Sequence, residues 1–171
     1  AFELFTGWAV LILGWVLISE FAGLWGIWLI LLNIGAILYW QQVGNPAFSF
    51  PYESLCMVLA FLNGLALTLY EAGIKHHLEW LQGSRWLRGL LFAGFLVSLS
   101  IPTVDLIIDP ENIERVTILA SIAWGVAIAA GYASYRYEIH DMIPLALVIS
   151  NISLILLIFI GFTTSIFSAT Y

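Results

Sequence analysis

The sequence contains very little charge. Only 9% of its 171 residues are Asp, Glu, Lys or Arg, whereas soluble domains carry about 25% because their surfaces must face water. A chain with so few charges cannot cover a water-exposed surface, which argues against a soluble globular domain. Its five basic residues and net charge of −6 also argue against binding to nucleic acid, which needs clustered Lys and Arg. A polybasic attachment to anionic lipid headgroups is disfavoured for the same reason.

Cysteine is scarce, and an initiator methionine is missing. The single Cys56 lies within an apolar run, which excludes a disulfide framework and a Cys-rich metal site. The chain begins Ala1-Phe2-Glu3, so we expect a processed chain or part of a longer protein. No basic segment precedes the first apolar run, and this run is therefore not expected to be a signal peptide.

Apolar residues, in contrast, are abundant. They make up 62% of the chain, and the mean hydropathy is +1.01. A spanning helix needs about 20 mainly apolar residues, and lipid admits only helices or closed barrels. The apolar runs lack the alternating pattern of barrel strands. The sequence therefore predicts an all-α, polytopic membrane bundle, with one transmembrane domain over residues 1–171 and spans at about 4–18, 24–40, 54–72, 86–104, 113–135 and 142–167.

The first two apolar runs are separated by only five residues, 19–23. One continuous helix over 4–40 would be about 55 Å long, which exceeds a hydrocarbon core of about 30 Å. We therefore expect two spans joined by a tight turn.

The basic residues predict the orientation of these spans. Lys75, Arg85 and Arg88 flank the link between spans three and four, and Arg136 lies between spans five and six. Only Arg115 lies on the opposite side, among acidic residues. The positive-inside rule therefore places the odd-numbered links in the cytoplasm and both termini outside.

The acidic link before span five predicts a helix start. Asp109, Pro110 and Glu111 fit an N-cap, a proline at the first helical position and an acid in the first turn. Glu111 and Arg115 are four residues apart and are expected to pair. The alternative, a calcium site made by the acids of this link, lacks the glycine-turned ligand loop of known calcium motifs.

Three histidines, His76, His77 and His140, fall in links on the same predicted side. The acids nearest to them are Glu79, Glu138 and Asp141. No pair of these histidines has the i,i+4 spacing that puts two ligands on one helix face, and none lies within a span to hold a haem. We favour solvated interfacial histidines and predict neither a metal site nor a catalytic set.

The span centres contain no carboxylate. This absence argues against an ion-coupled pump, which needs buried ionisable groups along its path. Glu71 lies near the end of span three, and Lys75, four residues later, is its expected partner.

Three spans contain an asparagine: Asn33, Asn63 and Asn151. An amide in hydrocarbon must find a hydrogen-bond partner, and such bonds between helices contribute roughly 0.6–2 kcal/mol. We therefore expect the three residues to join helices. The alternative is a polar site facing a ligand, because polar groups within spans also mark substrate paths.

Span five carries small residues at intervals of four, which allow a neighbouring backbone to approach closely. One row is Ala123, Ala127 and Gly131, and the other is Gly125, Ala129 and Ala133. Trp8 and Trp15 lie seven residues apart on one face of the first run. Ordinary packing is the favoured reading of these rings. No cofactor is predicted, although a face lined with rings is compatible with a bound lipid or pigment.

Several short segments carry a resemblance to a known group of proteins. They are WLILLN at 28–33 with LYW at 38–40, FLN at 61–63 with YE at 70–71, and YRY at 135–137 with Asp141. Their order resembles an uncharacterised family of bacterial polytopic membrane proteins, a domain of unknown function. The resemblance implies a bacterial inner-membrane location and chains longer than this one. It brings no activity and no catalytic residue.

Three functions follow as hypotheses. The first is a non-catalytic membrane subunit or scaffold that packs against other membrane subunits or against a second copy. The second is a carrier of an uncharged or lipophilic molecule, with Asn33, Asn63 and Asn151 lining its path. The third is a membrane enzyme with a cytoplasmic-side site at His76, His77 and His140.

Overall fold

The computed structural model describes residues 2–44, 52–75, 84–110 and 114–169. These residues are almost entirely helical and contain no strand, so the predicted all-α class is confirmed. The helices are α1 (Phe2–Ile18), α2 (Ala22–Tyr39), α4 (Tyr52–Lys75), α6 (Arg85–Ile108), α7 (Arg115–Ala133) and α8 (Met142–Ala169). Two π-helical turns, η1 (Trp40–Gly44) and η2 (Ser134–Glu138), extend α2 and α7.

Five helical segments within these ranges are long and apolar enough to cross a membrane. They are Ala22–Val43, Tyr52–Lys75, Arg85–Ile108, Arg115–Glu138 and Met142–Thr164. The helix α1 is equally apolar but has only 17 residues, fewer than the roughly 20 that a span usually needs. The structure therefore supports a multi-pass membrane protein with five full-length candidate spans and a shorter sixth helix.

The start of α7 differs from the sequence prediction. α6 continues through Pro102 to Ile108, and the Asp109 N–H donates to the Asp105 carbonyl at 2.9 Å. The α-helix α7 begins only at Arg115, and its N-cap residue, Glu114, makes no side-chain capping bond. The prediction that Asp109 caps this helix is therefore wrong, because Asp109 completes the end of α6. The predicted pair of Glu111 with Arg115 lies outside the described residues.

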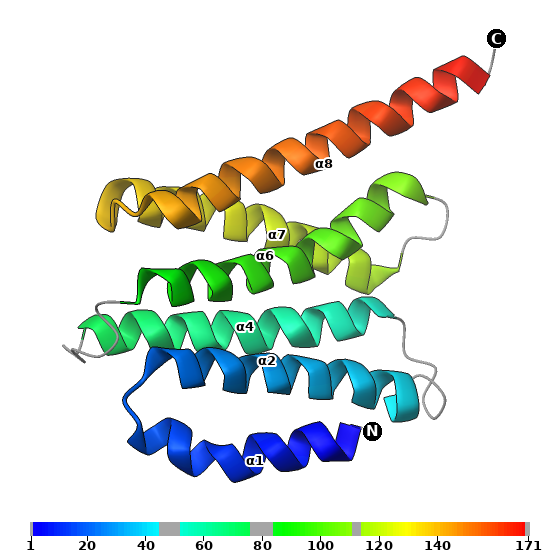
Figure 1. The fold of residues 1–171 in the computed structure, drawn as a ribbon. Coiled ribbons are helices and arrows are strands. Elements are labelled where there is room, and N and C mark those ends of the chain that lie inside the picture. The colour runs from blue at the N-terminus through cyan, green and yellow to red at the C-terminus, as the bar shows by residue number, and fades with distance from the viewer. Residues whose placement is uncertain (1, 45–51, 76–83, 111–113, 170–171) are drawn as a thin grey trace. The chain divides into compact units, whose positions relative to one another are not determined.

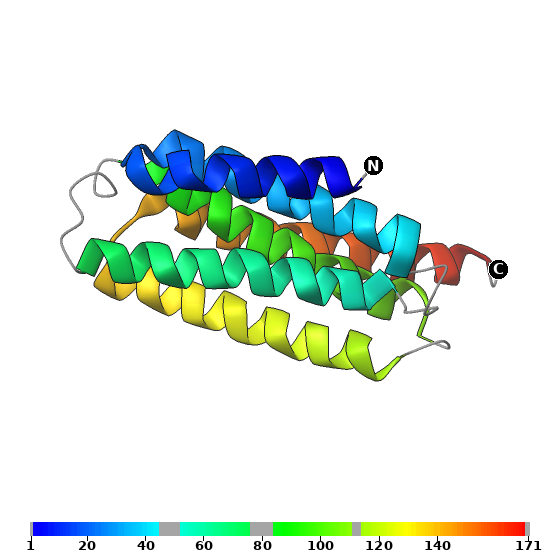
Figure 2. The same ribbon diagram turned by 90° about the horizontal axis from the view of Figure 1, so that it is seen from below.

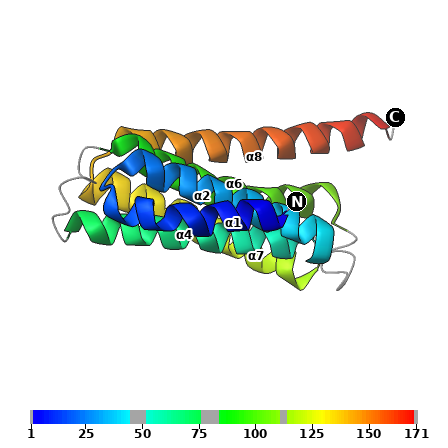
Figure 3. The ribbon, with the colours of Figure 1, turned by 60° about the horizontal axis from the view of Figure 1, so that its bottom comes forward.

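The chain divides into two compact units, residues 1–95 and 96–171, and the boundary falls within α6. In the first unit, α1, α2, α4 and the start of α6 lie side by side, and each runs antiparallel to the one before it (Figure 1). Figures 2 and 3 show from below and from an intermediate angle that α1, α2 and α4 run along one common direction. In the second unit, α7 and α8 run antiparallel and contact each other.

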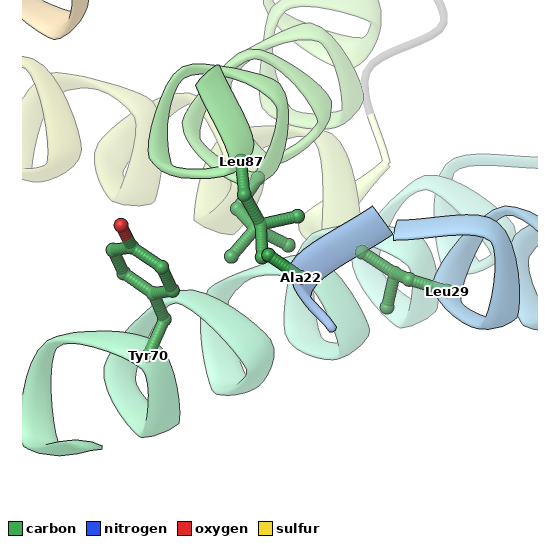
Figure 4. Packing of buried hydrophobic residues seen from close by; sticks show 5 residues of the cluster. Ala22, Leu29, Tyr70 and Leu87 are labelled. Atoms are coloured by element: carbon green, nitrogen blue, oxygen red, sulfur yellow. The ribbon is translucent and has the colours of Figure 1, made fainter. Parts of the chain in front are cut away.

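The first unit has a hydrophobic core shared by α2, α4 and α6. It consists of Ala22, Leu29, Tyr70, Leu87 and Leu91, and Figure 4 shows Leu87 reaching down to Ala22, with Tyr70 and Leu29 to either side. The helix α1 contributes little to such a core, because its only buried residues are Ala9 and Val16. It is attached to α2 by the Trp28 indole, whose Nε1 donates to the Ala9 carbonyl at 2.9 Å.

The turn between α1 and α2 contains a residue with a left-handed backbone. The Ser19 N–H closes α1 on the Trp15 carbonyl at 2.8 Å, and Glu20 then adopts a φ of 48°. This region costs a residue with a Cβ atom roughly 1–2 kcal/mol, whereas glycine adopts it readily. Because α2 begins at Ala22, Glu20 is what allows the chain to reverse within three residues.

We expect Glu20→Gly to raise the unfolding temperature, by an amount that corresponds to about 0.5–1 kcal/mol. Thermal unfolding in detergent can be followed by labelling of the thiol of Cys56, which is buried in the folded protein. Glu20→Ala is the matched control, because it removes the carboxylate and keeps the Cβ atom. An equal gain in both variants would assign the effect to charge instead of the backbone.

Candidate functional site

Asn33 of α2 and Asn63 of α4 contact each other through their amides. The Asn63 Nδ2 donates to the Asn33 Oδ1 at 2.8 Å, and the Asn33 Nδ2 lies 3.5 Å from the Asn63 Oδ1. Each Nδ2 also donates within its own helix, to the carbonyls of Leu29 at 2.9 Å and of Leu59 at 2.8 Å. The pair therefore joins α2 to α4 and keeps both amides engaged within the protein.

Gly94 of α6 brings a third helix against this pair. A Cβ atom at Gly94 would lie 2.8 Å from the Asn63 Oδ1, a separation that real Cβ contacts do not show. The Asn63 side chain, which is 5% exposed, is thus covered by the backbone of α6. Glycine at this position allows α6 to pack directly on the amide.

Asn151 joins three helices in the second unit. Its Oδ1 accepts a bond from the Trp124 Nε1 of α7 at 2.7 Å, and its Nδ2 donates to the Ser100 Oγ of α6 at 2.8 Å. The Ser100 hydroxyl in turn donates to the Leu96 carbonyl at 2.7 Å. All three asparagines are therefore hydrogen bonded inside the chain. Whether any of them also contacts a substrate stays a prediction.

A partly buried ion pair connects the end of α4 to the start of α6, and sequence reasoning missed it. The Arg88 Nε donates to the Glu71 Oε1 at 2.8 Å, and its Nη2 lies 3.5 Å from the Oε2. The Arg88 guanidinium also lies over the Tyr70 ring, 5.6 Å from its centroid. The Tyr70 hydroxyl donates to the Ser84 carbonyl at 3.0 Å, so the cluster ties the start of α6 to α4.

The sequence prediction paired Glu71 with Lys75, but Lys75 is exposed and Glu71 bonds to Arg88. The chain holds a signal for the correct partner. Glu71 lies four residues before the end of α4, and Arg88 lies three residues after the start of α6. In an antiparallel hairpin these two positions are at the same level. Matching residues that lie at similar distances from the link between α4 and α6 would have identified this pair. The i,i+4 rule considers only one helix and did not.

The two small-residue rows of α7 differ in their exposure. Ala127 and Gly131 are buried and Ala123 is half-buried, whereas the second row is exposed. A Cβ atom built at Gly125 would meet nothing within 4 Å. The second row, Gly125, Ala129 and Ala133, is therefore a smooth and uncovered face of α7.

The predicted histidine site is only partly visible. His76, His77 and Glu79 lie outside the described residues, and His140 is exposed in the turn before α8. Within the described ranges, no three His, Cys, Asp or Glu side chains come together as metal ligands would. The geometry therefore offers no support for an enzymatic reading here, and that hypothesis stays untested.

Among the described helices, two of the cavities have volumes of about 340 Å³ each. One lies within the first unit and has walls from α1, α2 and α4; it is lined by Phe2, Thr6, Leu31, Leu32, Gly35, Ala36, Tyr39 and Leu62. The other is at the turn between α7 and α8. The predicted ring-bearing face at Trp8 and Trp15 is exposed and belongs to neither cavity.

We expect Gly94→Ala to lower the free energy of unfolding by about 1–3 kcal/mol, because the new methyl group overlaps the Asn63 amide. Gly125→Ala is the matched control. It adds the same atom where nothing lies within 4 Å and is expected to be neutral or slightly stabilising, since alanine favours a helix. Thermal unfolding of both variants in detergent measures the difference. Equal effects would contradict the packing of Gly94 on Asn63.

We expect Arg88→Gln to lower the free energy of unfolding by about 2 kcal/mol, because Glu71 loses its charged partner. The value lies below that for fully buried pairs, since the Glu71 side chain keeps an exposure of 24%. Arg85→Gln removes an exposed arginine from the same helix and should change little. The double variant Arg88→Gln/Glu71→Gln should recover part of the loss. No recovery would mean that the pair does not stabilise the protein.

Comparison with known proteins adds no assignment to this geometry. No protein-family model matches the chain, and neither the curated proteins nor the solved structures contain a match. The resemblance to an uncharacterised bacterial family therefore stays a prediction, and the site is defined by its own contacts.

Proposed function

We propose that this chain is a non-catalytic integral membrane subunit that packs against further transmembrane helices through one face of α7. The observation that carries the proposal is the exposed row Gly125, Ala129 and Ala133. Transmembrane helices associate mainly through close packing, and small residues at intervals of four let two backbones approach. The partner is accordingly an apolar helix, from another subunit or from a second copy.

The bonding of the asparagines supports a subunit over a carrier. The amides of Asn33, Asn63 and Asn151 bond to neighbouring helices. These bonds occupy most of the donors and acceptors that a substrate would need. A subunit needs no such opening, because its polar groups serve to hold its own helices together.

The location belongs to the same proposal. Five apolar helices support a membrane setting. The bacterial inner membrane is inferred from the resemblance of the sequence, and the cytoplasmic position of Lys75, Arg85 and Arg136 from the positive-inside rule. Reactivity of single introduced cysteines in whole cells and in inverted vesicles would test the orientation.

We expect Ala129→Leu to release the partner helix, because the larger side chain keeps the two backbones apart. The added side chain costs about 1–3 kcal/mol through overpacking, which corresponds to a roughly tenfold weaker affinity for the partner helix. Ala130→Leu is the matched control, since it makes the same change about 100° further round the same helix. The measurement is the mass of the complex purified in mild detergent.

Two results would overturn the proposal. One is a wild-type chain that purifies as a lone monomer in mild detergent. The other is an equal loss of the complex in Ala129→Leu and Ala130→Leu, which would show that any added bulk on α7 has this effect.

A further inference from the structure

The turn between α7 and α8 has a fully specified backbone. The Ile139 N–H closes the π-helical turn η2 on the Ser134 carbonyl at 2.9 Å, and the Asp141 N–H donates to the Tyr135 carbonyl at 3.2 Å. The second bond joins residues six apart, one more than the 6→1 bond of a Schellman motif, and so continues the wide π-helical geometry to the end of the helix. The Asp141 Oδ1 then accepts a bond from the Ile143 N–H at 3.1 Å and caps α8. The backbone of this turn is therefore held in a defined conformation.

His140 occupies a position in this turn that usually belongs to glycine. Its φ is 56°, and a left-handed backbone costs a residue with a Cβ atom roughly 1–2 kcal/mol. Many helices end on a left-handed glycine, so a histidine here brings a side chain to a place where most helix endings have none. His140 lines the cavity at this turn, so the residue with the unfavourable backbone is part of the cavity wall.

Arg136 is held in the same wall by two aromatic rings. Its guanidinium lies 5.8 Å from the centroid of Tyr132 and 6.0 Å from that of Tyr137, and the two rings meet edge to face at 6.4 Å. Such contacts orient a cation but do not neutralise its charge. Among the described residues, no carboxylate lies within ion-pair distance of Arg136.

The two acids of this turn, Glu138 and Asp141, do not form an ion pair with Arg136. Glu138 is exposed and is not part of the cavity lining. Asp141 is buried, and its Oδ1 caps α8. The charge that faces the cavity is therefore that of Arg136.

The cavity itself fits an amphiphilic molecule. It has a volume of about 340 Å³ and is lined by Tyr135, Arg136, Tyr137, His140, Met142 and Leu145. Met142 and Leu145 provide an apolar wall, and Arg136 and His140 provide donors. The turn separates the candidate spans Arg115–Glu138 and Met142–Thr164, and the cavity is therefore at the level of the lipid headgroups.

We propose that this cavity binds an anionic phospholipid of the surrounding bilayer. Arg136 contacts the lipid phosphate, His140 donates to the headgroup, and the upper part of an acyl chain lies against Met142 and Leu145. A membrane lipid is favoured over free phosphate because a soluble anion would leave the apolar wall uncovered. The proposal does not rest on the small-residue face of α7.

The test uses the full chain in mild detergent, with phosphatidylglycerol or phosphatidylcholine added and the bound lipid counted by native mass spectrometry. We expect the wild type to retain phosphatidylglycerol in preference to phosphatidylcholine, whose choline cancels the charge of the phosphate. Arg136→Gln should reduce the retention of phosphatidylglycerol about fivefold, the factor expected for one basic residue near anionic lipid. Arg115→Gln, which removes an exposed arginine at the other end of α7, should leave it unchanged.

The variant His140→Gly distinguishes an effect on lipid binding from an effect on stability. It removes the imidazole and relieves the left-handed backbone, so it should raise the unfolding temperature and still reduce lipid retention. Unchanged retention in Arg136→Gln, or an equal loss in Arg115→Gln, would overturn the proposal. So would displacement of the lipid by inorganic phosphate alone, which would identify a site for a soluble anion.

Discussion

Hydrocarbon offers no hydrogen-bond partner to a polar side chain, so every amide that a span carries must be satisfied by another part of the protein. The two compact units each meet this requirement once. Asn33 and Asn63 bond to each other beneath Gly94 in the first unit, and Asn151 bonds to Trp124 and Ser100 in the second. Apolar side chains alone do not choose a neighbour in lipid, because lipid tails are equally apolar. These few polar bonds therefore determine which helices pair and how the paired helices are positioned along their axes.

The ends of the helices follow a different rule, because water and headgroups are close. There the chain uses charge and aromatic rings together. Arg88 bonds to Glu71 and lies over Tyr70, whereas Arg136 lies over Tyr132 and Tyr137, with no acid within ion-pair distance among the described residues. The first arrangement is complete within the chain and serves to join two helices. The second leaves the charge of Arg136 exposed, and an exposed charge without an acid partner is what the proposed lipid site needs.

The class of fold could be predicted from the sequence, because apolar runs of about 20 residues have few other interpretations. The polar residues of the spans could also be identified, but not their partners. Uniformly apolar helices do not reveal which face turns inward, so nothing in the sequence matched Asn151 with Trp124. Local rules misled twice. They paired Glu71 with Lys75 instead of Arg88, and they read Asp109 as the start of a helix when it completes the one before. The π-helical turn at Ser134–Glu138 has no sequence signature that we know.

The short helix α1 has a consequence for the membrane around it. Its 17 residues correspond to about 26 Å, a few Å less than the usual hydrocarbon thickness of about 30 Å. Glu3 in its first turn and Glu20 just beyond its end both need water, so the helix has little freedom to tilt or slide. A transmembrane α1 would therefore draw the two leaflets together on its side of the protein. Such hydrophobic mismatch sorts proteins into thinner bilayers and brings similarly short helices together.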